Sequence, residues 1–263
     1  MGFNRLSVAT ALLTVVAAGV VPLASASTGP SRSATRYRVS LQISTTRAVA
    51  HEDTVTLTGT VSPAAPGTKV KVQVRYDGQS TWRKAGSARV EQDSTYAFSF
   101  TPTTRQDRTY RVVKPGDDHA RADTSRERRL ESLGWVWLST LTPSRTEAVA
   151  TISAMPINGK SYGHTLYTGV DTTTGFVEYT LGRHAYKLRA TYGLSDRTET
   201  GGRGTVAVTT DGVPSFSQTF DLGQSVLQTT NVTDVYRIRI DFSQVADTPA
   251  TEPSAGAARV LMD

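Results

Sequence analysis

Residues 69–76 read KVKVQVRY, and this short stretch carries the pattern that decides the fold. Apolar or aromatic side chains occupy every second position, at Val70, Val72, Val74 and Tyr76, with charged or polar side chains between them. Successive side chains of a β-strand point to opposite faces, so this alternation predicts a strand with one face in a core and one in solvent. The same pattern recurs along most of the chain. We therefore expect an all-β protein.

Similar stretches surround this one between residues 38 and 115. They read VTLTGTV at 55–61, STYAFSF at 94–100 and TYRVV at 109–113, and turn residues separate them. Six or seven short strands at this spacing predict a β-sandwich of the immunoglobulin-like size class, with an extension to residue 130 left open. We expect Trp82 in its core, because large aromatic side chains dominate the cores of sandwiches.

A polar and charged segment, residues 116–134, follows as a linker or an edge strand. Alternation resumes in residues 135–263, and no segment there offers ten residues with a clean helical period. About eight strands with long loops predict a double-sheet jelly roll. In YRIRIDF (236–242) we expect four side chains to point inward: Tyr236, Ile238, Ile240 and Phe242.

Both halves resemble known families. Residues 38–130 resemble the bacterial immunoglobulin-like modules of secreted actinobacterial proteins, with landmarks at Gly59, Trp82, Tyr96, Phe98 and Tyr110-Arg111. Residues 135–263 resemble the NPCBM family of carbohydrate-binding modules. The resemblance rests on Leu138-Ser139, Gly159-Lys160, Tyr162, Leu166, Leu181-Gly182, Tyr192-Gly193-Leu194 and Asp211-Gly212. It implies a galactose-binding-like jelly roll that binds sugars, preceded by a spacer or adhesion domain.

The second half departs from the NPCBM pattern in two places. Thr165 stands where the family commonly has glycine, and Gly169 stands where it has histidine. The closing stretch EPSAGAARVLMD (252–263) replaces an acidic, tryptophan-bearing segment. Two functions are therefore considered: a carbohydrate-binding protein, or a structural or adhesion protein that binds another protein or the cell wall and has lost the sugar site.

A sugar site combines polar groups for the hydroxyl rim with an aromatic side chain for the apolar face of the ring. Two loops, 160–168 and 195–203, carry such side chains. The predicted carbohydrate-binding residues are Tyr162, His164, Tyr167, Asp196 and Arg197. We expect Trp137 to be buried, as a tryptophan at the start of a sandwich usually is.

Catalytic and metal motifs are absent from the sequence. There is no cysteine, and the four histidines lack metal-ligand spacing. No Asp-x-Asp-x-Asp run marks a calcium loop, although calcium held by backbone carbonyls is left open. No pair of carboxylates is marked for glycoside hydrolysis. We expect no enzyme activity and no cofactor.

The first residues have the three parts of a cleavable secretory signal: Arg5, an apolar run over 8–21, and Ala24-Ser25-Ala26. We expect a signal at 1–26, a linker at 27–37, and a protein that is secreted and not membrane-embedded. The net charge of +6 comes from cations scattered between apolar residues, which does not indicate a nucleic-acid partner. The expected partners are a glycan or polysaccharide, cell-wall polymers included.

Overall fold

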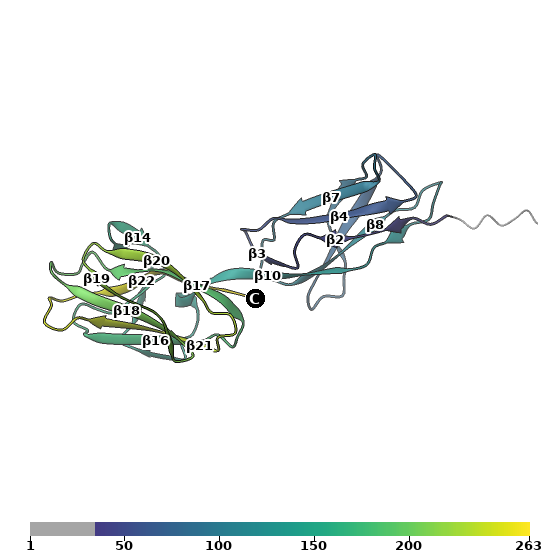
Figure 1. Ribbon diagram of the computed structural model, residues 1–263. Coiled ribbons are helices and arrows are strands. Elements are labelled where there is room, and N and C mark those ends of the chain that lie inside the picture. Colours follow the sequence, from purple (N-terminus) through teal and green to yellow (C-terminus); the bar gives the residue numbers. More distant parts are fainter. Residues whose placement is uncertain (1–34) are drawn as a thin grey trace, which may run out of the picture. The chain divides into compact units, whose positions relative to one another are not determined.

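The computed structural model describes residues 35–263, so the predicted signal lies outside the described residues. Thr35–Asp263 form one compact unit by their contacts. The described residues form strands β1 to β22 and one short 3-10 helix (Figure 1). The expectation of an all-β protein is confirmed. No helix in this part of the chain has the length and apolar character needed to cross a membrane.

The first half of the described chain forms a β-sandwich. Its strands are β1 (Arg38–Val39), β2 (Gln42–Ile43), β3 (Arg47–Val49), β4 (Val55–Ser62), β5 (Lys69–Tyr76), β6 (Arg83–Arg89), β7 (Thr95–Phe100), β8 (Arg108–Lys114) and β9 (Asp123–Thr124). In one sheet β4 pairs with β1, β2 and β7, and in the other β5 pairs with β6 and β8. Val70, Val72 and Val74 on β5 are buried in the core between them, while Lys69 and Lys71 are exposed.

Trp82 does not join this core, so the expectation that it is buried there is wrong. Its ring is half-buried, and the guanidinium groups of Arg75 and Arg111 lie 4.8 and 4.2 Å from the ring centroid. Trp82 precedes β6, next to strands that direct these two arginines outward. Cation–π contacts of this kind cover the indole without placing it among apolar side chains.

One long strand, β10 (Arg128–Trp137), has three partners along its length. Residues 128–130 pair with β8, residues 131–133 pair with β3, and residues 134–137 pair with β22 (Pro253–Met262). The segment expected as a linker or edge strand therefore contains β9 and much of β10. The domain bounds 38–115 and 135–263 stay predictions.

The second half forms another sandwich. Its remaining elements are η1 (Leu138–Thr140), β11 (Arg145–Glu147), β12 (Ala150–Ile152), β13 (Met155–Ile157), β14 (Lys160–Tyr162), β15 (Thr165–Tyr167), β16 (Thr174–Thr180), β17 (Ala185–Leu194), β18 (Arg203–Thr210), β19 (Val213–Asp221), β20 (Ser225–Asn231) and β21 (Arg237–Gln244). One sheet has the order β11-β16-β21-β18-β19. The facing sheet includes β12, β15, β22, β17 and β20, and β13 with β14 forms a separate hairpin.

The core of this sandwich collects alternating side chains from both sheets. Leu188 and Val260 come from one sheet, and Ile238, Ile240 and Phe242 come from the other. The Asp211-Gly212 pair makes the tight turn between β18 and β19, with positive φ angles of 50° and 82°. Two successive residues with positive φ are what a tight β-hairpin turn requires.

Tyr236 is exposed by 52%, so the expectation that it points inward is wrong. The reason is local. β21 begins one residue later, at Arg237, and the Asp211 carboxylate accepts hydrogen bonds from the backbone N–H groups of Tyr236 and Arg237. Tyr236 thus belongs to the turn that leads into the strand, and the alternation of the strand does not control its direction.

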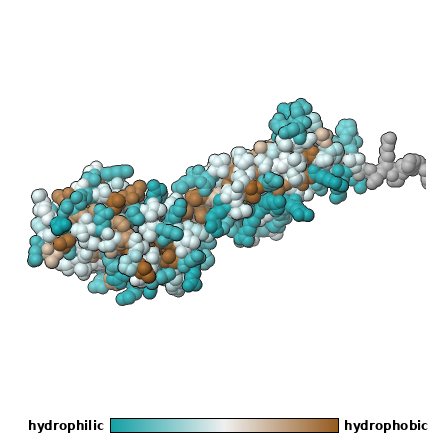
Figure 2. All heavy atoms as spheres, in the orientation of Figure 1, coloured by the Kyte–Doolittle hydropathy of each residue, from teal (hydrophilic) through white to brown (hydrophobic). Residues whose placement is uncertain are grey.

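The surface has no broad apolar area on the face that Figure 2 presents, where hydrophilic and hydrophobic residues are intermixed. The large apolar side chains that are exposed on the described chain are Val213, Leu227 and Tyr236. Leu227 lines the groove described below. Single exposed apolar side chains are normal on soluble proteins.

Replacing Leu188 with alanine should destabilise the second sandwich by about 2–5 kcal/mol, because the substitution removes buried methyl groups and leaves a cavity. Leu227→Ala makes the same chemical change on the neighbouring strand at a side chain that is 57% exposed. It should change stability by roughly 0.5 kcal/mol or less. Urea unfolding followed by circular dichroism measures both. Equal losses in the two variants would contradict the assignment of Leu188 to the core.

Candidate functional site

Strand register brings three side chains of the candidate site into one row. Trp137 on β10 lies directly opposite Arg259 on β22, and Arg259 lies directly opposite Arg189 on β17. The neighbours Leu188 and Val260 point into the core. Because side chains alternate between faces, the row lies on the outer face of the sheet.

A β-bulge shapes the sheet beside this row. Arg189 pairs with Arg259, but Thr191 pairs with Gly256, so β22 holds one residue more than β17 over this step. Ala257 in the bulge has a positive φ of 50°, and its N–H donates a hydrogen bond to the carbonyl oxygen of Gly163 at 3.0 Å. The bulge therefore anchors the chain that follows the β13–β14 hairpin.

Gly256 makes room for Tyr162. A Cβ atom at position 256 would lie only 2.8 Å from Cβ and Cγ of Tyr162 and 3.0 Å from Cδ1 of Ile157. Those distances are shorter than van der Waals contact, so a larger residue would displace the tyrosine. Glycine at this position lets Tyr162 rest directly on the strand beside the row.

Together these elements form a groove of about 450 Å³. This volume is within the usual range of about 300–1,000 Å³ for small-molecule sites. Trp137 and Tyr162 supply aromatic surface and Leu227 supplies aliphatic surface. The groove is lined by Trp137, Lys160, Tyr162, Arg189, Thr191, Ser225, Leu227, Gly256, Ala257 and Arg259. We call it the β22 groove.

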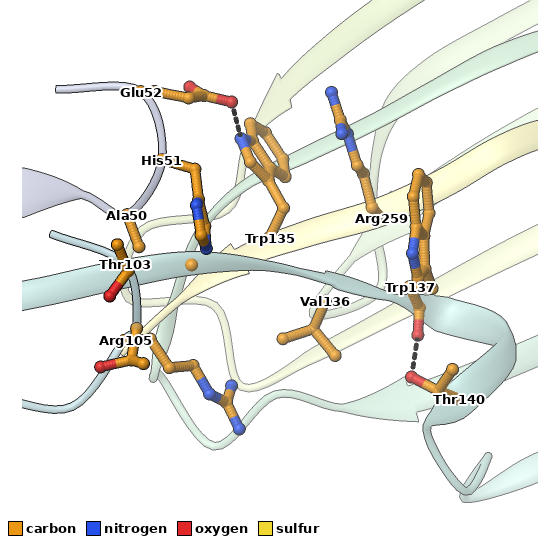
Figure 3. A pocket seen from close by; sticks show the side chains of 12 residues that line it. Ala50, His51, Glu52, Thr103, Arg105, Trp135, Val136, Trp137, Thr140 and Arg259 are labelled. Atoms are coloured by element: carbon orange, nitrogen blue, oxygen red, sulfur yellow. Dashed lines mark hydrogen bonds between the residues drawn. The ribbon is translucent and has the colours of Figure 1, made fainter. Parts of the chain in front are cut away.

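A second hollow of about 550 Å³ adjoins the row and shares Trp137 and Arg259 with the β22 groove. In it, Trp135, Arg259 and Trp137 project to the same side, whereas Val136 points to the other (Figure 3). The Arg259 guanidinium lies 4.8 Å from the ring centroid of Trp135 and 5.3 Å from that of Trp137. The indole N–H of Trp135 donates a hydrogen bond of 2.9 Å to Glu52 Oε1. The guanidinium is thus flanked by two aromatic rings.

Arg259 is half-buried, and its environment disfavours its charge. Burial lowers the pKa of Arg259, the positive charge of Arg189 lowers it further, and the carboxylate of Glu52 acts in the opposite direction. Arginine remains protonated in proteins even so. The outer face therefore holds two cationic guanidinium groups in adjacent strands at the edge of a groove.

Three of the five residues predicted from the sequence lie on or near β14 and β15. Tyr162 lines the β22 groove. His164 stacks on Trp137 with ring centroids 4.5 Å apart and planes inclined by 7°, and its Nδ1 shares a hydrogen bond of 2.9 Å with Ser139 Oγ. Tyr167 is half-buried on β15 and does not line the groove.

The other two predicted residues, Asp196 and Arg197, do not line the groove either. The Asp196 carboxylate accepts a hydrogen bond of 2.9 Å from the N–H of Gly159, in the turn between β13 and β14. The backbone N–H of Asp196 donates to the carbonyl of Pro156. Asp196 thus joins the second predicted loop to the hairpin that carries Tyr162. Arg197 is exposed.

Sequence reasoning missed Trp137, Arg189 and Arg259 as groove residues, and the expectation that Trp137 is buried is wrong. The ring of Trp137 is half-buried between His164 and Arg259. The alternation of β17 marks Arg189 as outward-facing, but nothing in the sequence pairs it with position 259. Only the register of β22 between β10 and β17 brings these residues together.

Comparison with known proteins adds three remote structural likenesses. The sequence matches no family model, and no curated protein matches it. The chain is similar to the CBM51-2 and INT domains of Clostridium perfringens ZmpB, with 9% identity and a TM-score of 0.42 over 62% of this chain and 39% of that one. The chain is also similar to a structure of the M60 catalytic domain with the CBM51-1 and CBM51-2 domains of Clostridium perfringens ZmpB. The sequence identity is 11% and the TM-score is 0.43, over 86% of this chain and 31% of that one.

The third similar structure is CBM51 from Clostridium perfringens GH95 in complex with methyl-galactose. It is 13% identical with a TM-score of 0.41, over 48% of this chain and 99% of that one. The chain thus spans well under half the length of the first two structures and nearly all of the third. All three scores lie below 0.5, and the family resemblances expected from the sequence stay predictions.

Replacing Asp196 with alanine should loosen the β13–β14 hairpin, because the Gly159 N–H loses a charged acceptor. We expect the Gly159 amide to exchange about tenfold faster, which corresponds to roughly 1.4 kcal/mol and is typical of such a bond. Hydrogen exchange measured by NMR checks this. Asp171→Ala, an exposed aspartate elsewhere, should leave the Gly159 amide unchanged. Unchanged exchange in Asp196→Ala would show that the carboxylate does not hold the turn.

Proposed function

We propose that this protein is a secreted, non-catalytic carbohydrate-binding protein whose second sandwich binds a glycan in the β22 groove. The first sandwich, over residues 38–115, acts as a spacer that presents residues 135–263. One observation carries the proposal: aromatic walls and hydrogen-bonding side chains converge in a single open groove on a sheet face. Trp137 and Tyr162 form the walls, and Arg189, Thr191 and Arg259 supply the polar groups.

This combination suits the chemistry of a sugar ring. A pyranose has an apolar C–H surface and a rim of hydroxyl groups that both donate and accept hydrogen bonds. Aromatic and aliphatic side chains pack against the C–H surface, here Tyr162, the 57% exposed Leu227 and the part of Trp137 that His164 and Arg259 leave uncovered. Guanidinium and hydroxyl groups bond the rim. Covering the exposed Leu227 side chain with a ligand removes apolar surface from water, which favours binding.

The groove is held in shape before a ligand arrives. Tyr162 rests on Gly256, the Ala257 N–H bonds the Gly163 carbonyl, and His164 stacks on Trp137. Side chains already fixed in their bound positions lose less conformational entropy when a ligand binds. His164, predicted as a contact residue, supports binding in this arrangement by orienting Trp137.

The lining of the groove also supports a role without catalysis. Glycoside hydrolysis uses two carboxyl groups on either side of the scissile bond. Among the described residues that line the β22 groove, none is an aspartate or a glutamate. A glycan bound there would meet donors and apolar surface, but no general acid and no nucleophile of this kind.

Substitution of the aromatic walls should weaken glycan binding. A glycan array with residues 27–263 identifies a ligand, and isothermal titration then measures its affinity. We expect Tyr162→Ala and Trp137→Ala each to raise the dissociation constant about tenfold, the equivalent of roughly 1.4 kcal/mol, because each removes a packing surface for the sugar. Trp137→Phe should lose less, since it keeps an aromatic face.

Trp82→Ala is the matched control, because it removes an equally large indole from the first sandwich. It should leave the affinity within about twofold. The proposal fails if no glycan binds at high micromolar concentration, or if Trp82→Ala weakens binding while Trp137→Ala does not. Capture of a protein that free sugar cannot displace would favour the adhesion function instead.

A further inference from the structure

The β22 groove offers its ligand hydrogen-bond donors and few acceptors. Arg189, Arg259 and Lys160 donate only, whereas the hydroxyl groups of Tyr162, Thr191 and Ser225 can donate or accept. None of the described lining residues is Asp, Glu, Asn or Gln, the side chains whose oxygens accept bonds from sugar hydroxyl groups. The groove therefore complements a ligand that is rich in acceptor oxygens.

The two arginines of the groove occupy directly opposite positions on two paired strands. Arg189 and Arg259 lie directly opposite in the antiparallel pairing of β17 and β22. Like charges at directly opposed positions destabilise a sheet. Within residues 35–263, neither guanidinium forms an ion pair with a carboxylate. Glu52, which acts on Arg259 at longer range, accepts its hydrogen bond from Trp135.

Arginines of the facing sheet are arranged differently. Arg203 pairs with Asp221 at 2.8 Å, Arg237 pairs with Glu178 at 3.3 Å, and Arg239 pairs with Asp241 at 2.7 Å. Three of the four arginines on strands of that sheet are thus paired with carboxylates of the same sheet, and the fourth, Arg145 on β11, lies over the Phe176 ring. On the groove side, neither Arg189 nor Arg259 has a carboxylate of the described chain at ion-pair distance, and Glu52 acts on Arg259 only from farther away.

Resting on the proposed function, we infer that the glycan bound in the β22 groove carries an anionic group, a carboxylate or a sulfate, that Arg189 and Arg259 hold between them. A guanidinium is a planar fork of N–H donors that matches two oxygens of such a group. The anion supplies the missing counter-charge for both arginines. Trp135 and Trp137 flank the Arg259 guanidinium and limit its orientations, so its fork is aimed before binding.

The anion also explains why the aromatic and basic side chains share one groove. An uncharged sugar would use Trp137 and Tyr162 and would accept hydrogen bonds from the guanidinium groups, but it would leave both cations without a counter-charge. A bare anion would need the cations but not the aromatic walls. A charged sugar uses both, because its ring packs on the walls while its carboxylate or sulfate meets Arg189 and Arg259.

Two matched pairs of polymers test the inference with residues 27–263. Polygalacturonate and its fully methyl-esterified form differ only in the carboxylate, and dextran sulfate and dextran differ only in the sulfate. We expect at least one charged polymer to bind about tenfold or more tightly than its neutral partner. Which pair shows the difference identifies the anionic group.

Four variants distinguish binding in the groove from attraction to the general positive charge of the protein. Arg189→Gln and Arg259→Gln should each weaken binding of the charged polymer about tenfold. Arg83→Gln removes one exposed arginine from β6 and should change it by less than twofold. Arg259→Lys keeps the charge but lacks the planar fork, so it should restore only part of the affinity. Thermal unfolding shows that each variant is folded, and Arg189→Gln decides the matter if Arg259→Gln does not fold.

Each outcome bears on one of the two proposals. Equal binding of charged and neutral polymers would keep the carbohydrate-binding function and overturn the anionic ligand. Equal weakening by Arg83→Gln and the two groove variants would also overturn it, because the attraction would then be diffuse. If a broad glycan array and all four polymers show no binding, the carbohydrate-binding function itself fails.

Discussion

The position of β22 between β10 and β17 is the constraint on which the second sandwich and its groove depend. This strand pairs with β10, β15 and β17, and its inward side chains, such as Val260, form part of the core. The burial of that inward face fixes the register, since a slip by one residue would turn every side chain to the other face. The same register sets Arg259 between Trp137 and Arg189 on the outside.

The two faces of β22 therefore have opposite effects on the stability of the free protein. Inward, burial of apolar side chains stabilises the sheet. Outward, two like charges face each other and both side chains are half-buried, which costs stability in the free protein. Local conflicts of this kind, on a scaffold that is otherwise consistent, are expected at functional sites. A ligand that supplies negative charge would relieve the conflict and so gain affinity from it.

The β-bulge and the β13–β14 hairpin together shape this row into a groove. The extra residue in β22 gives the loop after β14 a backbone partner, and Gly256 lets Tyr162 lie against the sheet. Asp196 fixes the hairpin from the far side, through Gly159. Trp137 and Arg259 line both this groove and the neighbouring hollow, so the hollowed surface continues from the β22 groove along β10.

The sequence by itself determined the all-β class, most strand positions and the inward side of strands such as β5 and β21, because alternation is a local property of the chain. It also pointed to Tyr162. It did not reveal that Trp82 and Trp137 are half-covered by arginines, that Tyr236 lies in a turn, or that Arg189 and Arg259 meet. Most of those facts depend on contacts between segments far apart in the sequence, such as the pairing of Arg259 with both Trp137 and Arg189, and no local pattern encodes which strands pair or in which register. The closing segment, which departs from the expected family pattern, supplies Gly256 and Arg259 only because β22 inserts between β10 and β17.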